Sequence, residues 1–254
     1  TIHYYQENIH DFAWFADKSY LIDKSYVRLP STENFVITYT YYHQKSKKQW
    51  SKAIDYVNNA IWFYSDQIGY YPYQYCTAVE GLPGVGGGME YPMITLIGPG
   101  GDDITIERTI IHEVAHNWFY GILAFNEREH SWLDEGFTSF YENEYMKWRY
   151  PYSNFLSSLT DLSSDKTPNI FGMKNLPAHY MQYVAVQYLQ SRNIDQSMSL
   201  PSELMNPVNY YILSYYKPVL MINQFKELIG HYTFKELMND FFNDWKFKHP
   251  YPED

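Results

Sequence analysis

Two histidines and two glutamates carry the most informative spacing in this chain. The sequence reads His-Glu-Val-Ala-His from His112 to His116, and Glu135 follows in Trp-Leu-Asp-Glu-Gly-Phe, with eighteen residues between His116 and Glu135. On a helix, His112 and His116 project from the same face. Two imidazoles and a carboxylate are a typical ligand set for catalytic zinc, with the fourth position left for water. Glu113 lies beside such a metal and can take a proton from that water, so the pattern predicts a hydrolytic zinc site.

Two helices must position these side chains. Apolar residues recur at helical spacing from 104 to 120, and Asp102, Asp103 or Thr105 can cap the start of that helix. Ser131 stands at capping-box spacing before an acidic residue, which predicts a second helix that begins just before Glu135. The alternative is two surface helices with incidental histidines. It must explain two histidines on one face of an apolar-rich helix, where polar groups without partners are costly.

A glycine-rich segment precedes the first of these helices. Residues 86–92 read Gly-Gly-Gly-Met-Glu-Tyr-Pro, and the run 89–97 is apolar and β-prone. Glycines let another backbone approach closely, and Pro92 lacks an N–H, so the run is expected to be an edge strand. An edge strand beside a zinc site can pair with an extended peptide. The alternative is a hairpin turn with a solvated glutamate. The candidate substrate-binding residues are Gly87, Gly88, Met89 and Glu90.

Together these motifs resemble a known family. HEVAHNWFYG at 112–121, followed by WLDEGF at 132–137, is similar to the aminopeptidase N family of gluzincin zinc metallopeptidases. The glycine segment resembles that family's GxMEN motif, with Tyr91 in place of the usual asparagine. The resemblance implies that Glu90 binds the free α-amino group of the substrate. It also implies one Zn²⁺ per chain, with His112, His116 and Glu135 as ligands.

A further segment resembles the family's Tyr-x-Lys-Gly sequence, whose tyrosine hydroxyl stabilises the tetrahedral intermediate. Residues 214–218 read Ser-Tyr-Tyr-Lys-Pro. The alignment puts this role on Tyr215, with Tyr216 as the rival. Pro218 replaces the usual glycine and suits the first turn of a helix that runs to Ile229. Tyr215 is therefore expected on the loop that enters this helix, where its phenol can point at an oxyanion.

Composition excludes several classes of function. The chain has 254 residues, of which 45% are hydrophobic and 20% aromatic, so it can bury a sizeable core. Its net charge of −10 argues against binding to nucleic acid. No apolar run approaches the eighteen residues that a transmembrane helix needs. The single cysteine, Cys76, cannot form an internal disulfide, and no compartment is indicated.

Strand-like segments come first and helical segments later, which predicts an α+β class. Strands are expected at 34–42 and 89–97, and the residues from 150 to 205 are expected to be irregular around a helix at 181–190. The other predicted helices span 49–68, 218–229 and 233–246, the last opened by Thr233 and Glu236 as a capping box.

The family resemblance implies a single thermolysin-like catalytic domain over 1–254, with a zinc cleft between two lobes. About 1–121 would form a mixed α/β lobe and about 122–254 a mainly helical lobe. It also implies that the flanking domains of the same polypeptide, an N-terminal β domain and a C-terminal helical domain, lie outside this chain.

The sequence therefore predicts a zinc aminopeptidase that removes N-terminal residues from peptides. Glu113 would be the general base and Tyr215 the oxyanion donor. One alternative is a hydrolase of the same fold without selectivity for a free N-terminus. Another is a non-catalytic peptide-binding module, which would have no need of Glu113.

Overall fold

The computed structural model describes residues 3–82, 87–151, 176 and 180–254. The chain divides into two compact units, one formed by Thr1–Asn126 together with Ile229–Asp254 and the other by Glu127–Leu228. The last helix thus belongs with the first unit, although it is distant from it in sequence. The predicted division near residue 121 stays a prediction. Residues 152–175 and 177–179 of the stretch predicted to be irregular lie outside the described residues.

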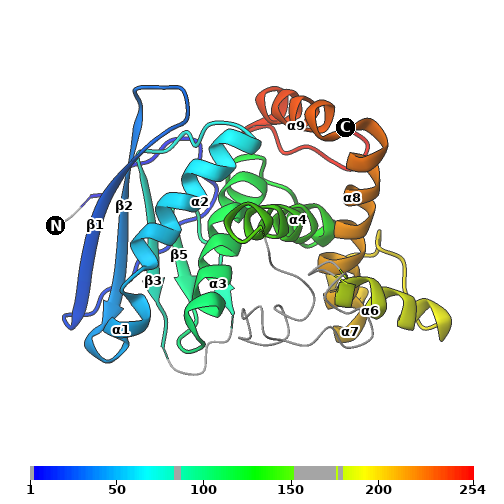
Figure 1. Cartoon of the computed structure of the whole chain (residues 1–254), viewed down its shortest axis with the longest axis horizontal. Coiled ribbons are helices and arrows are strands. Elements are labelled where there is room, and N and C mark those ends of the chain that lie inside the picture. The colour runs from blue at the N-terminus through cyan, green and yellow to red at the C-terminus, as the bar shows by residue number, and fades with distance from the viewer. Residues whose placement is uncertain (1–2, 83–86, 152–175, 177–179) are drawn as a thin grey trace. The chain divides into compact units, whose positions relative to one another are not determined.

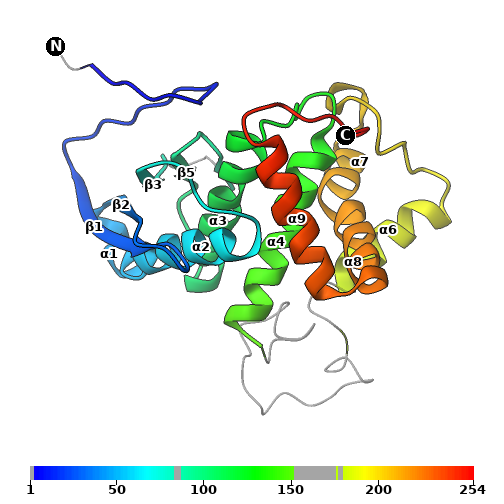
Figure 2. The same cartoon turned by 90° about the horizontal axis from the view of Figure 1, so that it is seen from above.

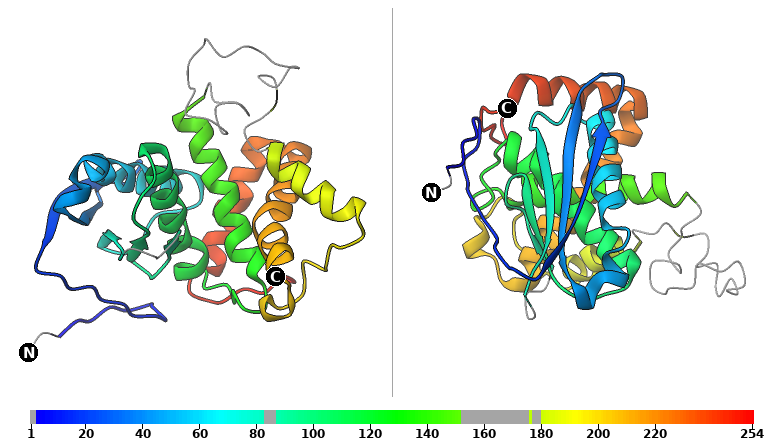
Figure 3. Two further views of the ribbon diagram at one scale, coloured as in Figure 1. Left: turned by 90° about the horizontal axis from the view of Figure 1, so that it is seen from below. Right: turned by 90° about the vertical axis from the view of Figure 1, so that its left-hand side faces the viewer.

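The first unit is built on a mixed sheet. Among the described residues five strands join in the order β1-β2-β3-β5-β4. The pairs β1/β2 and β5/β4 are antiparallel, whereas β2/β3 and β3/β5 are parallel. Figure 3 (right) shows the strands side by side. Their bounds are Tyr20–Arg28 for β1, Phe35–His43 for β2, Tyr75–Glu80 for β3, Gly88–Met89 for β4 and Ile94–Ile97 for β5.

One face of the sheet is covered by helix α2, Ala53–Gln67 (Figure 1). Burial alternates along β2, because successive side chains of a strand point to opposite faces. Asn58 of α2 links two strands on this face. Its Oδ1 accepts a hydrogen bond from Thr38 Oγ1 at 2.6 Å, and its Nδ2 donates to Ser25 Oγ at 3.0 Å. The predicted helix at 49–68 is thus present, but it is interrupted after a short helix α1, Lys47–Trp50.

The predicted strand at 89–97 is wrong as a single element. The chain reverses between β4 and β5, and Met93 in the reversal has a φ of 63°. Asn117 Oδ1 accepts a hydrogen bond from the Met93 amide at 2.8 Å, which ties this turn to the rest of the unit. Pro92 lies in the reversal and not inside a strand, as its missing N–H favours. The two-residue strand β4 is the last strand in the sheet order, so the prediction of an edge applies to Gly88 and Met89.

Three helical segments complete the first unit. Asn239 of α9 donates a hydrogen bond from Nδ2 to the carbonyl of Ile68, at the end of α2. The helix α9 begins directly after Gly230, which has a φ of +87°. The predicted capping box at Thr233 is therefore wrong, because Thr233 already lies within the first turn. The segments are α3, Asp103–His116, the π-helical stretch Asn117–Ile122 and α9, His231–Trp245.

The regular secondary structure in the described part of the second unit is all helical. Helices α7 and α8 run on from one another through a π-helical stretch (Figure 2), and α6 packs against that stretch with Val186 and Leu189 around Ile212. Helix α6 agrees with the helix predicted at 181–190. The helical bounds are Ser131–Arg149 for α4, Tyr180–Ser191 for α6, Ser202–Leu204 for a 3-10 turn, Pro207–Tyr211 for α7, Ile212–Tyr216 for the π-helical stretch and Lys217–Ile229 for α8.

The second predicted capping box is also wrong. Ser131 is the first residue of α4 and not its cap, and its hydroxyl is buried in a hydrogen bond with Ser214 Oγ at 2.6 Å. The Ser131 hydroxyl is therefore used in a tertiary hydrogen bond and does not cap the helix. The α+β class with a mixed sheet and a helical region is confirmed. None of the helices in the described ranges is long and apolar enough to cross a membrane.

Candidate metal centre and active site

Helix α3 is held at its start, middle and end. Asp102 is the N-cap, and its side chain accepts a hydrogen bond from the Thr105 amide. This settles the choice among the three predicted caps. In the middle, the Tyr64 hydroxyl of α2 donates to the carbonyl of Ile111 at 3.0 Å. Trp118, just beyond the end of the helix, is fully buried and donates from its indole N–H to the carbonyl of Gly69 at 2.7 Å. These contacts fix the helix face that carries the two histidines.

The Nε2 atoms of the two histidines point toward the same position. Nε2 of His112 lies 3.2 Å from Nε2 of His116, and the rings stand nearly perpendicular, at 77°. Two ligands of a tetrahedral ion with bonds of 2.0–2.1 Å lie about 3.3 Å apart. The histidine pair therefore has the nitrogen separation that a bound zinc ion requires. His116 is buried, with 1% of its surface exposed, so its ring is held in place by the surrounding protein.

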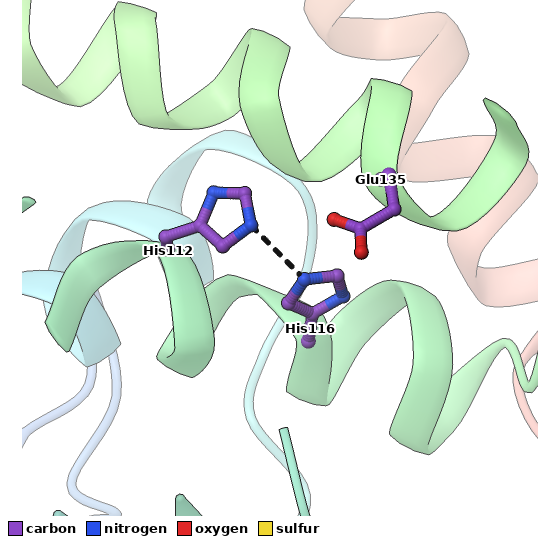
Figure 4. A group of neighbouring side chains, drawn as sticks. All are labelled: His112, His116 and Glu135. Carbon is purple, nitrogen blue, oxygen red and sulfur yellow. Dashed lines mark hydrogen bonds between the residues drawn. The ribbon is translucent and has the colours of Figure 1, made fainter. Parts of the chain in front are cut away.

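Glu135 adds a carboxylate to this pair. One ring nitrogen from each of His112 and His116 and one carboxylate oxygen of Glu135 all lie within 4.8 Å of one another (Figure 4). Glu135 comes from the first two turns of α4 and is 9% exposed. Two imidazoles and one carboxylate are the donor set expected for a catalytic zinc ion with an open fourth position. The three predicted ligands thus fit the metal chemically.

A second group joins the glycine-rich segment to the histidine helix. Ligand atoms of Glu90, Glu113 and His116 also lie within 4.8 Å of one another, and all three residues are buried. Glu90 directly follows the edge strand β4, and Glu113 lies between the two histidines on α3. The two carboxylates that the sequence singled out for the substrate amine and for proton transfer are therefore neighbours.

The glutamate of α3 rests directly on the edge strand. A Cβ atom built on Gly88 would lie 2.3 Å from Oε1 of Glu113 and 2.4 Å from its Cδ. In this structure the carboxylate occupies the space that a side chain at position 88 would fill. Gly87 has a φ of +71°, a conformation that favours glycine, and its carbonyl accepts a hydrogen bond from the Gly98 amide at 2.7 Å. The glycine segment therefore presents backbone beside the carboxylate of Glu113.

Asn117 is a site residue that the sequence analysis did not identify. It follows His116 directly, is 1% exposed, and uses both ends of its amide. Its Nδ2 donates to the carbonyl of Val114 at 3.0 Å, and its Oδ1 accepts from the Met93 amide. The residue couples the end of the histidine helix to the turn that carries the edge strand. No local sequence signal indicates this role, because the burial of Asn117 and its contact with the Met93 amide are set by tertiary packing.

Tyr215 lies in a helix and not on the predicted entry loop. It belongs to the π-helical stretch before α8, and its hydroxyl donates to Glu135 Oε1 at 2.5 Å. The rival Tyr216 makes a different contact, a hydrogen bond of 3.4 Å to the hydroxyl of Tyr211. Pro218 is compatible with the helix because the wider π-helical turn precedes it. Of the two tyrosines, Tyr215 is thus the one whose hydroxyl contacts a predicted metal ligand.

A close helix contact brings Tyr215 and Glu135 together. A Cβ atom on Gly136 would lie 2.4 Å from Cβ of Pro218 and 3.2 Å from the carbonyl oxygen of Ser214. Helix α4 therefore touches the π-helical stretch and the start of α8 at Gly136, one residue after Glu135. Any larger side chain at this position would push the two helices apart.

Tyr210 is a second residue that the sequence analysis missed. Burial, together with the charges of Glu135 and Glu127, raises the pKa of its phenol to about 12, although a hydrogen bond with Tyr215 acts in the opposite direction. With 28 tyrosines in the chain, no sequence signal separated this one from the others.

Comparison with known proteins supports this picture. Residues 99–254 match the family model of the Peptidase family M1 domain. Over 167 residues the chain is 26% identical to leucine aminopeptidase 2 of Sclerotinia sclerotiorum, which covers 64% of this chain and 24% of that protein.

Solved structures of an M1 zinc metallopeptidase from Deinococcus radiodurans share the fold. One superposes with a TM-score of 0.63, and a mutant bound to the substrate Tyr-Ser-Ala gives 0.64. Both are 14% identical to this chain and cover 92% of it. The chain spans 46% of the length of those structures and about a quarter of the leucine aminopeptidase. Since the family model covers more than half of the chain, in agreement with the zinc-ligand spacing, the chain belongs to peptidase family M1.

Proposed function

We propose that this chain is the catalytic part of a zinc aminopeptidase, which hydrolyses the first peptide bond of substrates with a free N-terminus. The observation that carries the proposal is the pair of histidine nitrogens 3.2 Å apart, with three carboxylates grouped around them. Membership of peptidase family M1 supports it. The leucine aminopeptidase to which the chain is similar has the proposed activity in its name.

The zinc ion would be held by His112, His116 and Glu135. When bound, zinc supplies a Lewis acid that polarises the scissile carbonyl and lowers the pKa of water towards about 7. His116 and Glu135 are both largely buried, so bulk water has little access to these two ligands.

Glu113 moves the proton. Its carboxylate takes a proton from the attacking water as the new C–O bond forms, and returns that proton to the leaving nitrogen as the C–N bond breaks. Its contact with the Gly88 backbone supports this role, because a peptide lying along β4 would pass beside the carboxylate. The short edge strand offers main-chain groups with which an extended substrate can pair.

Glu90 would bind the substrate ammonium, and Tyr215 would bind the carbonyl oxygen of the scissile bond. Glu90 provides a carboxylate for the substrate ammonium, and its position beside Glu113 supports binding of the amino end one residue from the bond that breaks. The Tyr215 hydroxyl would donate to the oxyanion that develops on the carbonyl oxygen. Its hydrogen bond to Glu135 supports a position next to the reacting group.

Metal analysis tests the foundation of this proposal. We expect one zinc ion per chain in the purified protein. His116→Ala should lower the zinc content at least about tenfold, because a three-ligand site loses one donor. The exposed His231 on α9 offers the control, and His231→Ala should keep full zinc. Elemental analysis after dialysis gives both values. A wild-type protein that binds no zinc, or a His116→Ala variant with a full equivalent, would refute the site.

Selectivity for a free N-terminus depends on Glu90. Glu90→Ala should lower kcat/KM about 10–150-fold on substrates with a free α-amine, the value of a charge-assisted hydrogen bond. N-acetylated substrates have no ammonium to lose, so their much lower kcat/KM should change little. Glu90→Gln should lie between wild type and alanine. Equal losses on both substrate classes would instead favour a hydrolase of this fold without N-terminal selectivity.

A further inference from the structure

One buried asparagine joins the end of the histidine helix to the turn that follows the edge strand. Asn117 comes directly after α3 and is 1% exposed. Its Nδ2 donates a hydrogen bond to the carbonyl of Val114 at 3.0 Å, and its Oδ1 accepts one from the amide of Met93 at 2.8 Å. Because one partner is an acceptor and the other a donor, the orientation of the side-chain amide is fixed. The side chain therefore connects two segments that lie 24 positions apart in the sequence.

The turn that Asn117 contacts is closed by a hydrogen bond of 3.1 Å from the Ile94 amide to the carbonyl of Tyr91. Pro92 is its second residue and Met93 its third, and Met93 has a φ of 63°. A proline followed by a residue with positive φ is the pattern of a type II turn, in which glycine or asparagine is preferred at the third position. Methionine carries a Cβ atom and is therefore strained in this conformation.

Both backbone groups of Met93 are tied to other elements. Its amide donates to Asn117 Oδ1, and its carbonyl accepts a hydrogen bond of 2.9 Å from the amide of Thr77 in β3. A residue in a sparsely populated conformation persists only where the surrounding structure holds it there. Strand β3 supplies one of these two restraints and Asn117 the other. Loss of the Asn117 side chain therefore lets the turn relax toward a conformation that methionine prefers.

The turn begins one residue after Glu90. Glu90 is buried, and its carboxylate lies within 4.8 Å of ligand atoms of Glu113 and His116. On the other side of Glu90, the carbonyl of Met89 accepts a hydrogen bond from Thr95 Oγ1 at 3.1 Å, which ties β4 to β5. Glu90 is thus held between a strand contact and the turn. A shift of the turn moves its carboxylate relative to Glu113.

We propose that Asn117 is a positioning residue for recognition of the substrate N-terminus. By holding the Met93 amide it fixes the Tyr91–Ile94 turn, and the turn fixes the Glu90 carboxylate beside Glu113. The strength of an ammonium–carboxylate contact depends on this placement, because hydrogen bonds weaken when their distance and angle are lost. Asn117 acts through Glu90 and need not touch the substrate. The inference rests on the proposed function, in which Glu90 binds the substrate ammonium.

Asn117→Ser tests the contact with Met93 by itself. A serine hydroxyl in a helix can donate to the carbonyl three residues earlier, here that of Val114, but it leaves the Met93 amide without the acceptor that asparagine provides. We expect kcat/KM on substrates with a free α-amine to fall about 5–30-fold, mainly through a higher KM, and by less than in Glu90→Ala. On N-acetylated substrates kcat/KM should stay within about twofold, and the zinc content should stay at the wild-type value.

Asn58→Ala is the matched control. Asn58 also lies in the first unit and uses both ends of its side-chain amide, but its partners Thr38 and Ser25 lie on β2 and β1 and not on the glycine-rich segment. Its loss should lower the thermal stability and leave the selectivity between the two substrate classes at the wild-type value.

Two double variants connect the effect to Glu90 and to the turn. In a Glu90→Ala background Asn117→Ser should have no further effect, because the carboxylate that Asn117 positions is gone. Glycine adopts the φ of Met93 without strain, so Met93→Gly in an Asn117→Ser background should restore most of the lost selectivity.

Hydrogen exchange gives a readout that needs no turnover. In Asn117→Ser the Met93 amide should exchange at least about tenfold faster, measured by mass spectrometry on peptides that cover the Tyr91–Ile94 turn. Exchange in peptides that cover α3 should not change. A merely structural role for Asn117 would raise exchange in both regions and would lower kcat/KM equally on both substrate classes.

The outcomes separate the two proposals. Equal losses on both substrate classes in Glu90→Ala would remove the amine-binding role from Glu90, and the positioning role of Asn117 would fall with it. A selective loss in Glu90→Ala combined with wild-type selectivity in Asn117→Ser would leave the proposed function intact and overturn the role of Asn117 alone. The same conclusion would follow from losses that add in the Glu90 background, or from a Met93→Gly change that restores nothing.

Discussion

Replacing Glu113 by glutamine is expected to leave zinc bound and to lower kcat by at least about 10²–10⁴-fold. The amide has nearly the shape of the carboxylate, so it fits the same place against Gly88. It cannot accept the proton of the attacking water or return it to the leaving nitrogen. The metal ligands are untouched, so the zinc content should stay at the wild-type value. Steady-state kinetics and elemental analysis on the same preparation measure both effects.

The control for this variant is Asp103→Asn on the same helix. Asp103 is exposed in the first turn of α3 and pairs with Lys52 at the surface, so its loss should change kcat by less than about twofold. If Glu113→Gln retains near-normal turnover with zinc bound, Glu113 is not the general base. A wild-type protein that binds zinc and peptides but never cleaves them would instead favour a peptide-binding module.

Tyr215→Phe is expected to lower kcat about 10²–10³-fold with little change in KM. An oxyanion donor acts mainly in the transition state, and the loss of one such donor has this magnitude. The phenyl ring keeps the stacking with Tyr211, so the helix should remain folded. Michaelis–Menten kinetics of both single variants, Tyr215→Phe and Tyr216→Phe, give the comparison. A larger loss in Tyr216→Phe than in Tyr215→Phe would transfer the oxyanion role to Tyr216.

The histidine pair was predictable because its geometry is local. Four residues of helix fix the spacing of His112 and His116, and a helix of that length follows from the apolar pattern around it. The candidate ligand Glu135 was found through its motif, and the fold class followed from the order of strands and helices. These features depend on periodicity and on short sequence patterns, which a single chain displays directly.

The features that were wrong or missed depend on tertiary contacts. Ser131 had the spacing of a helix cap, but its hydroxyl is used by Ser214, 83 residues away. The strand at 89–97 was broken by a turn that Asn117 holds from another element. Neither partner can be read from the local sequence.

The loop predicted around Tyr215 was wrong for a related reason. Pro218 was read as the start of a helix, since proline ends or opens α-helices. The chain instead continues through Pro218 as helix, because a π-helical turn with different carbonyl positions comes before it. Periodicity rules based on 3.6 residues per turn do not describe such a turn, and they also separate Tyr210 from Tyr215.

The same π-helical stretch makes chain length matter as well as residue type between Ile212 and Tyr216. A π-helical turn contains about one residue more than an α-helical turn, so it corresponds to the insertion of a single residue into an α-helix. Deleting one residue there would let the helix close in α form, and every side chain on the N-terminal side would rotate by about 100° relative to α8. Related sequences should therefore keep the number of residues in this stretch as strictly as they keep the tyrosine that corresponds to Tyr215.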